Sequence, residues 1–189
     1  MQLSEKELDE ILVLKRAKNA DTLKDKERIK EILLDNNKII YMLNNKELEE
    51  ADAPNDEYYG VNILPYYMIN PTQSNVQNFI CYEIGYNEEF RYNDKMRINQ
   101  LTFYVLCKHE NIIEKHTGVA RHDLIGELLL EQFEWTNYFG QVCHCVSNLA
   151  SVVDTDYACR TLIFEFNSMN GLTKPRNGKN TVINKEVHY

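Results

Sequence analysis

The sequence predicts an α+β fold in which an antiparallel sheet of about four strands carries helices packed on one face. Apolar residues recur every three or four positions in the first third of the chain and again after residue 123, as is typical of helices. Over residues 97–108 and 158–166, every second side chain belongs to the same face, and apolar residues recur on one of the two faces, as is typical of strands. Because helices and strands come in blocks rather than in regular alternation, we expect an antiparallel sheet.

The 189 residues divide into three expected parts. Residues 1–24 form an N-terminal helical extension, and residues 25–166 form the α+β domain. Residues 167–189 carry four basic side chains and one acidic side chain, and glycine and proline interrupt any periodic pattern there. We expect this last part to be an extended C-terminal tail that is either flexible or ordered by a partner.

Two helices are expected ahead of the sheet. Ser4 and Glu7 form a capping box at the start of the first. Asp21 is expected to cap the second, whose apolar pattern ends at residues 44–45. The acidic residues 47–60, which include proline and glycine, are expected to form a loop.

From residue 61 the pattern changes to strands. Residues 61–69 are rich in branched and aromatic side chains, although Pro65 confines this segment to an edge or a bulge. Further strands are expected over residues 79–86, 97–108, 147–153 and 158–166.

A helix over residues 123–139 is expected between the strands, with Asp123 as its N-cap and Gly140 at its end. Its broad apolar stripe suits packing on a sheet. We expect one core between sheet and helix, made by Leu101, Phe103, Val105, Leu128, Leu129, Phe133, Leu162 and Phe164.

Composition excludes several classes of protein. The net charge of −8 argues against wrapping a nucleic-acid backbone. No apolar run approaches the roughly 20 residues of a membrane helix, and the charged N-terminus does not predict a secretory signal. The odd number of cysteines, five, without regular spacing, predicts free thiols in a cytosolic setting.

No catalytic, cofactor-binding or metal-binding residues are predicted. Cys143, His144 and Cys145 are the most metal-like cluster, but we expect the two thiols to point to opposite faces of an extended strand and to be buried. His109 and Glu110 do not continue into a zinc-protease motif, because the next histidine is seven residues away. Paired carboxylates leave open a metal-dependent nuclease or hydrolase.

Two segments are candidate subunit or partner interfaces. In the first, Gly118 permits a left-handed turn, and Arg121 and Asp123 follow it at the start of the predicted helix. In the second, Thr181, Val182 and Ile183 of the basic tail are suited to add to an exposed sheet edge of a neighbouring subunit.

The order of elements resembles that of the tail terminator and tail-completion proteins in the neck of tailed bacteriophages. The resemblance covers roughly residues 25–166 and is carried by the strand 98–105, the turn 117–121, the helix 123–128 and the last strand, 162–166. It implies a structural protein of the virion, located in the tail or neck and made in the host cytoplasm, without enzymatic activity.

As the resemblance implies, such a protein forms a ring, typically hexameric, that terminates the tail tube and docks it to the head–tail connector or other neck proteins. DNA passes through the channel without specific binding, which suits an acidic chain because like charges repel. Besides the enzyme, a monomeric binding module acting on a host protein remains an alternative.

Overall fold

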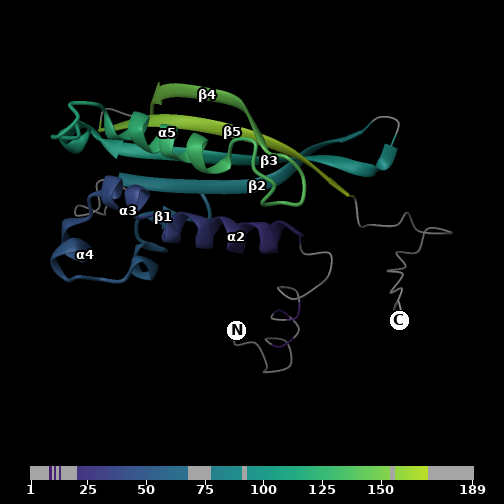
Figure 1. Ribbon diagram of the computed structural model, residues 1–189, viewed down its shortest axis with the longest axis horizontal. Coiled ribbons are helices and arrows are strands. Elements are labelled where there is room, and N and C mark those ends of the chain that lie inside the picture. Colours follow the sequence, from purple (N-terminus) through teal and green to yellow (C-terminus); the bar gives the residue numbers. More distant parts are fainter. Residues whose placement is uncertain are drawn as a thin grey trace, which may run out of the picture.

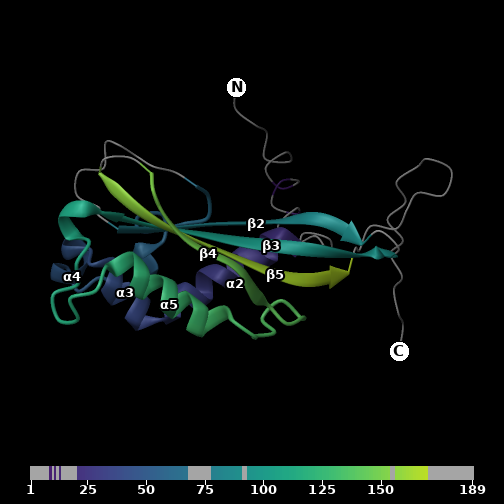
Figure 2. The same cartoon turned by 90° about the horizontal axis from the view of Figure 1, so that it is seen from above.

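A computed structural model of the chain describes residues 21–67, 78–90, 93–153 and 156–169, together with Asp9, Ile11 and Val13. The elements in chain order are α2 (Asp21–Asp35), α3 (Asn37–Leu43), α4 (Lys46–Glu50), the 3₁₀ helix η1 (Asn55–Tyr58), β1 (Ile63–Leu64), β2 (Asn78–Phe90), β3 (Asn93–Lys108), the 3₁₀ helix η2 (His109–Asn111), α5 (Arg121–Phe133), β4 (His144–Val152) and β5 (Tyr157–Met169). The α-helices lie on one side of a single sheet (Figures 1 and 2), which confirms the predicted α+β class.

The sheet has five strands in the order β1-β2-β3-β5-β4. Every pairing is antiparallel except that of β1, which runs parallel to β2. β1 is one strand more than the four predicted for the sheet. Of the strand predicted over residues 61–69, only the two residues of β1 form a strand among the described residues. It ends at Leu64 because Pro65, the next residue, has no N–H to donate to a ladder.

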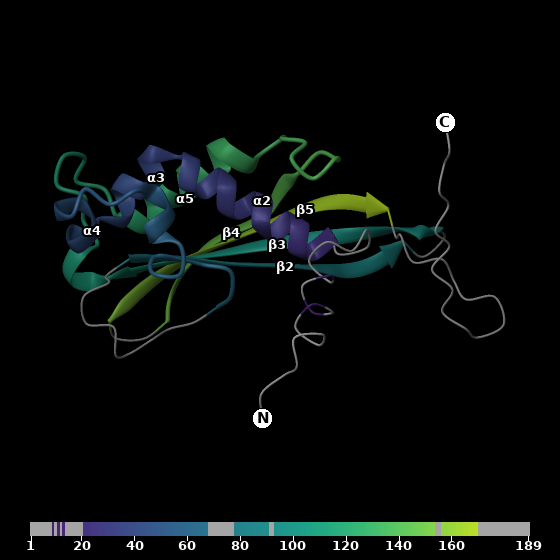
Figure 3. The same ribbon diagram turned by 90° about the horizontal axis from the view of Figure 1, so that it is seen from below.

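The core lies between the sheet and the helices (Figure 3). Seven of the eight predicted core residues are fully buried there, and the eighth, Leu128, packs against them partly exposed. Phe103 is at the centre, with ring centroids 5.0 Å from Phe133 and 5.9 Å from Phe164. A smaller apolar cluster that includes Phe79, Leu106 and Cys159 forms separately. The predicted alternation of faces along β3 is therefore confirmed.

Asparagines divide the predicted second helix into shorter ones. The Asn36 side chain accepts hydrogen bonds from the backbone N–H groups of Lys38 and Ile39 and so starts α3. Asn44 ends α3 with a left-handed backbone at φ +48°, and Asn45 then caps α4. The prediction of a loop over residues 47–60 was therefore wrong, because α4 and η1 occupy part of this segment.

Buried asparagines also connect the helices to the sheet. The Asn45 side chain donates to the Asn62 side chain at 2.7 Å, and Asn62 donates to the Asn78 carbonyl at 2.8 Å. Asn78 in turn donates to the carbonyl of Leu43, the last residue of α3, at 2.9 Å. Each bond satisfies a polar group that would be costly to bury alone, so α3, β1 and β2 are held at one corner.

α5 is shorter than predicted, because it ends at Phe133 rather than near residue 139. The chain reverses at Trp135, which has a left-handed backbone with φ +58°. Here the Glu134 carboxylate accepts the backbone N–H of Cys145 at 2.6 Å. The last strand, β5, continues to Met169, three residues beyond the predicted end of the α+β domain at residue 166.

Candidate functional site

The predicted turn before α5 is held by a glutamate that sequence reasoning did not single out. Gly118 has φ +70°, as expected for a left-handed position, and is exposed. The Glu114 carboxylate accepts the backbone N–H groups of His116 at 3.0 Å and Thr117 at 2.7 Å. The bond from His116, followed by those from Thr117, holds the pKa of Glu114 at about 2. The charged carboxylate thus fixes the turn that leads into α5.

Arg121, a predicted interface residue, is buried inside the chain and only 5% exposed. Its Nη1 donates to the carbonyl of Met42 at 3.5 Å, so the guanidinium lies at the C-terminal end of α3. Cations there are favourable because the last helical carbonyls carry partial negative charge. The side chain therefore connects α5 to α3, and a subunit contact at this turn stays a prediction.

Asp123 does not cap α5, because Ala120 occupies the N-cap position. Its carboxylate instead accepts the Nε of Arg160 at 2.8 Å, and Nη1 of the same arginine donates to Asn148 at 2.6 Å. Arg160 passes directly under Gly126, where an added Cβ would lie 2.5 Å from the arginine Cδ. This network joins α5, β5 and β4. No sequence pattern indicates it, because its members are far apart in the chain.

The titratable side chains near this network are not arranged as a nucleophile and a base. Burial lowers the pKa of His122, although Asp123, whose Oδ1 is 3.2 Å from its Nε2, opposes the shift. Burial raises the pKa of Cys107 and raises that of Cys143 to about 12. These thiols stay protonated at neutral pH and are therefore poor nucleophiles.

None of the five cysteines forms a disulfide, as predicted. The expectation that Cys143 and Cys145 face opposite ways was wrong, because both pack against the helix-side core while His144 is exposed. Residues two apart in an extended chain share a face. Within the described ranges, no three histidine, cysteine or acidic side chains lie together in a way that could hold a metal ion.

β4 forms one edge of the sheet. Its nine residues, HCVSNLASV, include no lysine, acidic residue or proline. Leu149 and Val152 are 67% and 69% exposed. Natural sheets normally place charges, proline or a covering segment at such an edge, since its unpaired backbone groups otherwise bind another strand.

The direction of the β4 backbone groups follows from one hydrogen bond. Val153 donates its N–H to Tyr157 at 3.2 Å, so it faces β5. N–H directions alternate in an antiparallel ladder, so those of Asn148, Ala150 and Val152 point to the open edge. The bulge near Val146 shifts the register, and the Cys145 N–H, bound by Glu134, points outward as well.

The opposite side of the sheet also has an unpaired stretch. β1 pairs only with Ile80 and Cys81 of β2. Residues 82–90 of β2 therefore have no strand partner on that side within the part of the chain that is described. Among the described residues, the sheet thus ends in two different edges, each with backbone groups that have no strand partner.

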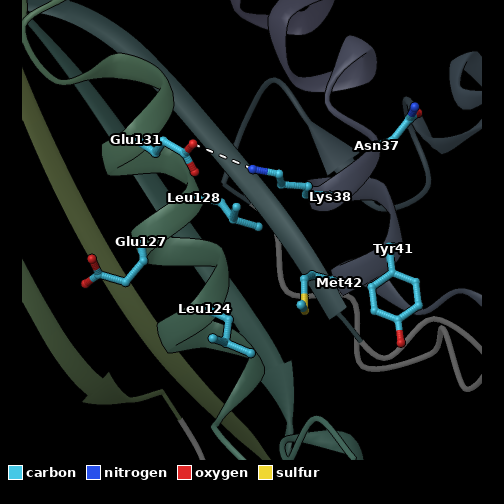
Figure 4. A pocket seen from close by; sticks show the side chains of 8 residues that line it. All are labelled: Asn37, Lys38, Tyr41, Met42, Leu124, Glu127, Leu128 and Glu131. Atoms are coloured by element: carbon cyan, nitrogen blue, oxygen red, sulfur yellow. Dashed lines mark ion pairs between the residues drawn. The ribbon is translucent and has the colours of Figure 1, made fainter. Parts of the chain in front are cut away.

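A groove of about 660 Å³ lies between α3 and α5 (Figure 4). The lining combines apolar and charged side chains: Asn37, Lys38, Tyr41 and Met42 from α3, and Leu124, Glu127, Leu128 and Glu131 from α5. A salt bridge of 3.6 Å between Lys38 and Glu131 crosses it. The groove is a second candidate contact surface.

The predicted interface residues of the tail, Thr181, Val182 and Ile183, lie outside the described residues.

Comparison with known proteins identifies the family of the chain. The YomW family model matches residues 36–166, which include most of the helical layer and almost the whole sheet. No curated protein matches the chain. None of the described helices is both long and apolar enough to cross a membrane. The chain belongs to the YomW family, whose name derives from a Bacillus phage, and is thus associated with phages.

Proposed function

We propose that the chain is a structural protein of a tailed phage that forms a ring at the head–tail junction. In this role it terminates the tail tube, docks it to the connector or other neck proteins, and lies in the neck of the virion without enzymatic activity. One observation carries the proposal: within the part of the chain that the structure describes, the sheet ends in two different edges without a strand partner, β4 and residues 82–90 of β2.

Two different edges favour a ring over a symmetric pair. When one surface contacts a different surface on the next copy, the contact repeats head to tail and closes into a ring if the rotation per subunit permits. β4 against the free part of β2 is such a contact. The number of copies is proposed as six from the resemblance to tail terminators.

The charge of the chain supports a channel that DNA crosses without binding. Residues 61–166, which contain α5 and almost the whole sheet, carry thirteen acidic and seven basic side chains. A negative wall repels phosphate groups. The duplex therefore moves through the ring without being held.

Ala150 offers a direct test of the β4 edge. It is exposed, and its N–H points away from β5. Ala150→Pro removes that donor and places a ring at the edge while leaving the donors to β5 intact, and proline is tolerated at such positions. Ala150→Val is the matched control, because it keeps the N–H and favours a strand.

We expect native mass spectrometry to give a ring for the wild type and for Ala150→Val, and a monomer with an unchanged circular dichroism spectrum for Ala150→Pro. Electron microscopy of tail tubes from the same phage, mixed with each protein, should show capped ends only with the first two. A ring formed by Ala150→Pro would exclude the β4 edge as the contact. A wild type that is monomeric even with tubes present would overturn the ring function.

A further inference from the structure

The groove between α3 and α5 has the form of a site for a third helix. On α5 it presents Leu124, Glu127, Leu128 and Glu131, which recur at the spacing of one helix face. This stripe covers two turns, roughly 10 Å at 1.5 Å per residue. Figure 4 shows Tyr41 and Met42 of α3 across from it. An apolar floor between two helices is the surface on which amphipathic helices dock.

The N-terminal segment carries a matching stripe. Leu8, Ile11, Leu12 and Lys15 follow the same spacing over the same two turns. Ile11 has helical backbone geometry and is 51% exposed, so its apolar side chain lacks full cover in a single chain. Burying such a side chain is favourable by roughly 1.5–3 kcal/mol.

We propose that residues 8–15 of one copy dock as a helix in the α3–α5 groove of a neighbouring copy. Leu8, Ile11 and Leu12 then lie on Leu124, Leu128 and Met42. This inference rests on the proposed ring, because it supplies a second contact between its subunits.

The C-terminal end of the N-terminal segment complements the groove in charge. Among the described residues, Glu127 has no ion-pair partner, and Glu131 is only loosely paired with the largely exposed Lys38. Lys15 is the fourth member of the N-terminal stripe and is followed by Arg16 and Lys18. A basic end of the incoming helix therefore lies beside the acidic wall of the groove.

The length of the linker favours a neighbouring copy over the same chain. α2 begins at Asp21, and its 15 residues span roughly 21 Å. The groove lies beyond the far end of α2, along α3 (Figure 1). Residues 16–20 span at most about 17 Å when extended. Docking of residues 8–15 in the groove of their own chain would stretch this linker to its limit. The groove of a neighbouring copy can lie closer to residue 21, so docking there does not require a fully extended linker.

A zero-length carbodiimide cross-link on the full chain tests the contact, because it joins a lysine amine to a carboxylate only when the two touch. We expect a linked peptide containing Lys15 with Glu127 or Glu131 in the covalent dimer band of a denaturing gel, and not in the monomer band. Ile11→Asp should abolish it. Val13→Asp is the matched control, since Val13 is 62% exposed but lies off the stripe.

The outcomes separate this inference from the proposed function. If the linked peptide is confined to the monomer band, the segment docks on its own chain and the inference fails. It also fails if no such peptide forms in a protein that native mass spectrometry shows to be a ring, or if Ile11→Asp retains the link. A wild type that is monomeric overturns the ring itself, which the native mass reveals independently.

Discussion

Single residues determine how closely the helices approach the sheet, and Gly126 is the clearest case. Arg160 crosses under it to reach Asp123 and Asn148, and only the missing Cβ leaves room for the arginine. The arginine is held at both ends of its guanidinium, so it cannot move aside without breaking a charge-assisted bond. One glycine in α5 thus permits three elements to share a single cation.

We expect Gly126→Ala to destabilise the protein. Displacing Arg160 costs roughly 1–3 kcal/mol, and the higher helix propensity of alanine offsets about 1 kcal/mol of this. The net loss in urea unfolding should be about 1 kcal/mol. Gly85→Ala is the control, because no atom lies within 4 Å of its added Cβ. A Gly126→Ala variant as stable as the wild type would show that Arg160 is readily displaced.

At the scale of elements, the sequence predicted most strands and their faces but fewer of the helix limits. Alternation predicts strands well because every second residue of β3 and β5 must be apolar to face the helices. The break at Asn36 was missed, since asparagine occurs both within helices and at their caps. Asn62 and Arg121 have partners set by tertiary structure, and no local pattern reveals such partners.

The hydrogen bonds of the Glu114 carboxylate in the turn before α5 predict that stability depends on pH. Its pKa is about 2 in the folded protein against an ordinary value of 4.5. The charged form therefore stabilises the fold above pH 4.5, and that stabilisation is lost as the pH falls toward 2. Wild type should melt at a higher temperature than Glu114→Gln at pH 6, and the difference should shrink steadily between pH 4.5 and 2. A difference that is constant with pH would contradict this account.

For the whole molecule, the fold class and the helix-covered face of the sheet could be predicted from the sequence, but the strand order could not. Adjacency of β3 and β5, separated in the chain by α5 and β4, depends on long-range pairing that periodicity does not encode. The open edges that carry the proposed function follow from that order, so the candidate site also lay beyond sequence reasoning.

The basic tail leads to a prediction at the same scale. β5 ends at Met169, so a deletion of residues 170–189 leaves the sheet whole. It removes four basic residues and one acidic residue from an otherwise acidic chain. We expect the truncated protein to fold but to form rings only at higher concentration, because attraction between the tail and its neighbours is lost. Native mass spectrometry at several dilutions measures this, and unchanged assembly and tube capping would make the tail dispensable.

The strand order also bears on how the chain is made. β4 pairs only with β5 among the described strands, and β5 is the last of them to be synthesised. While the chain grows on the ribosome, β2 and β3 can already form their hairpin, but β4 emerges with nothing to pair with. A strand without lysine, acidic residues or proline and with exposed Leu149 and Val152 then remains unpaired beside other nascent chains of the same kind, a state prone to aggregation. Slow translation between residues 152 and 169 would lengthen the time that β4 stays unpaired, so we expect the yield of soluble protein to depend on the codons in this short stretch.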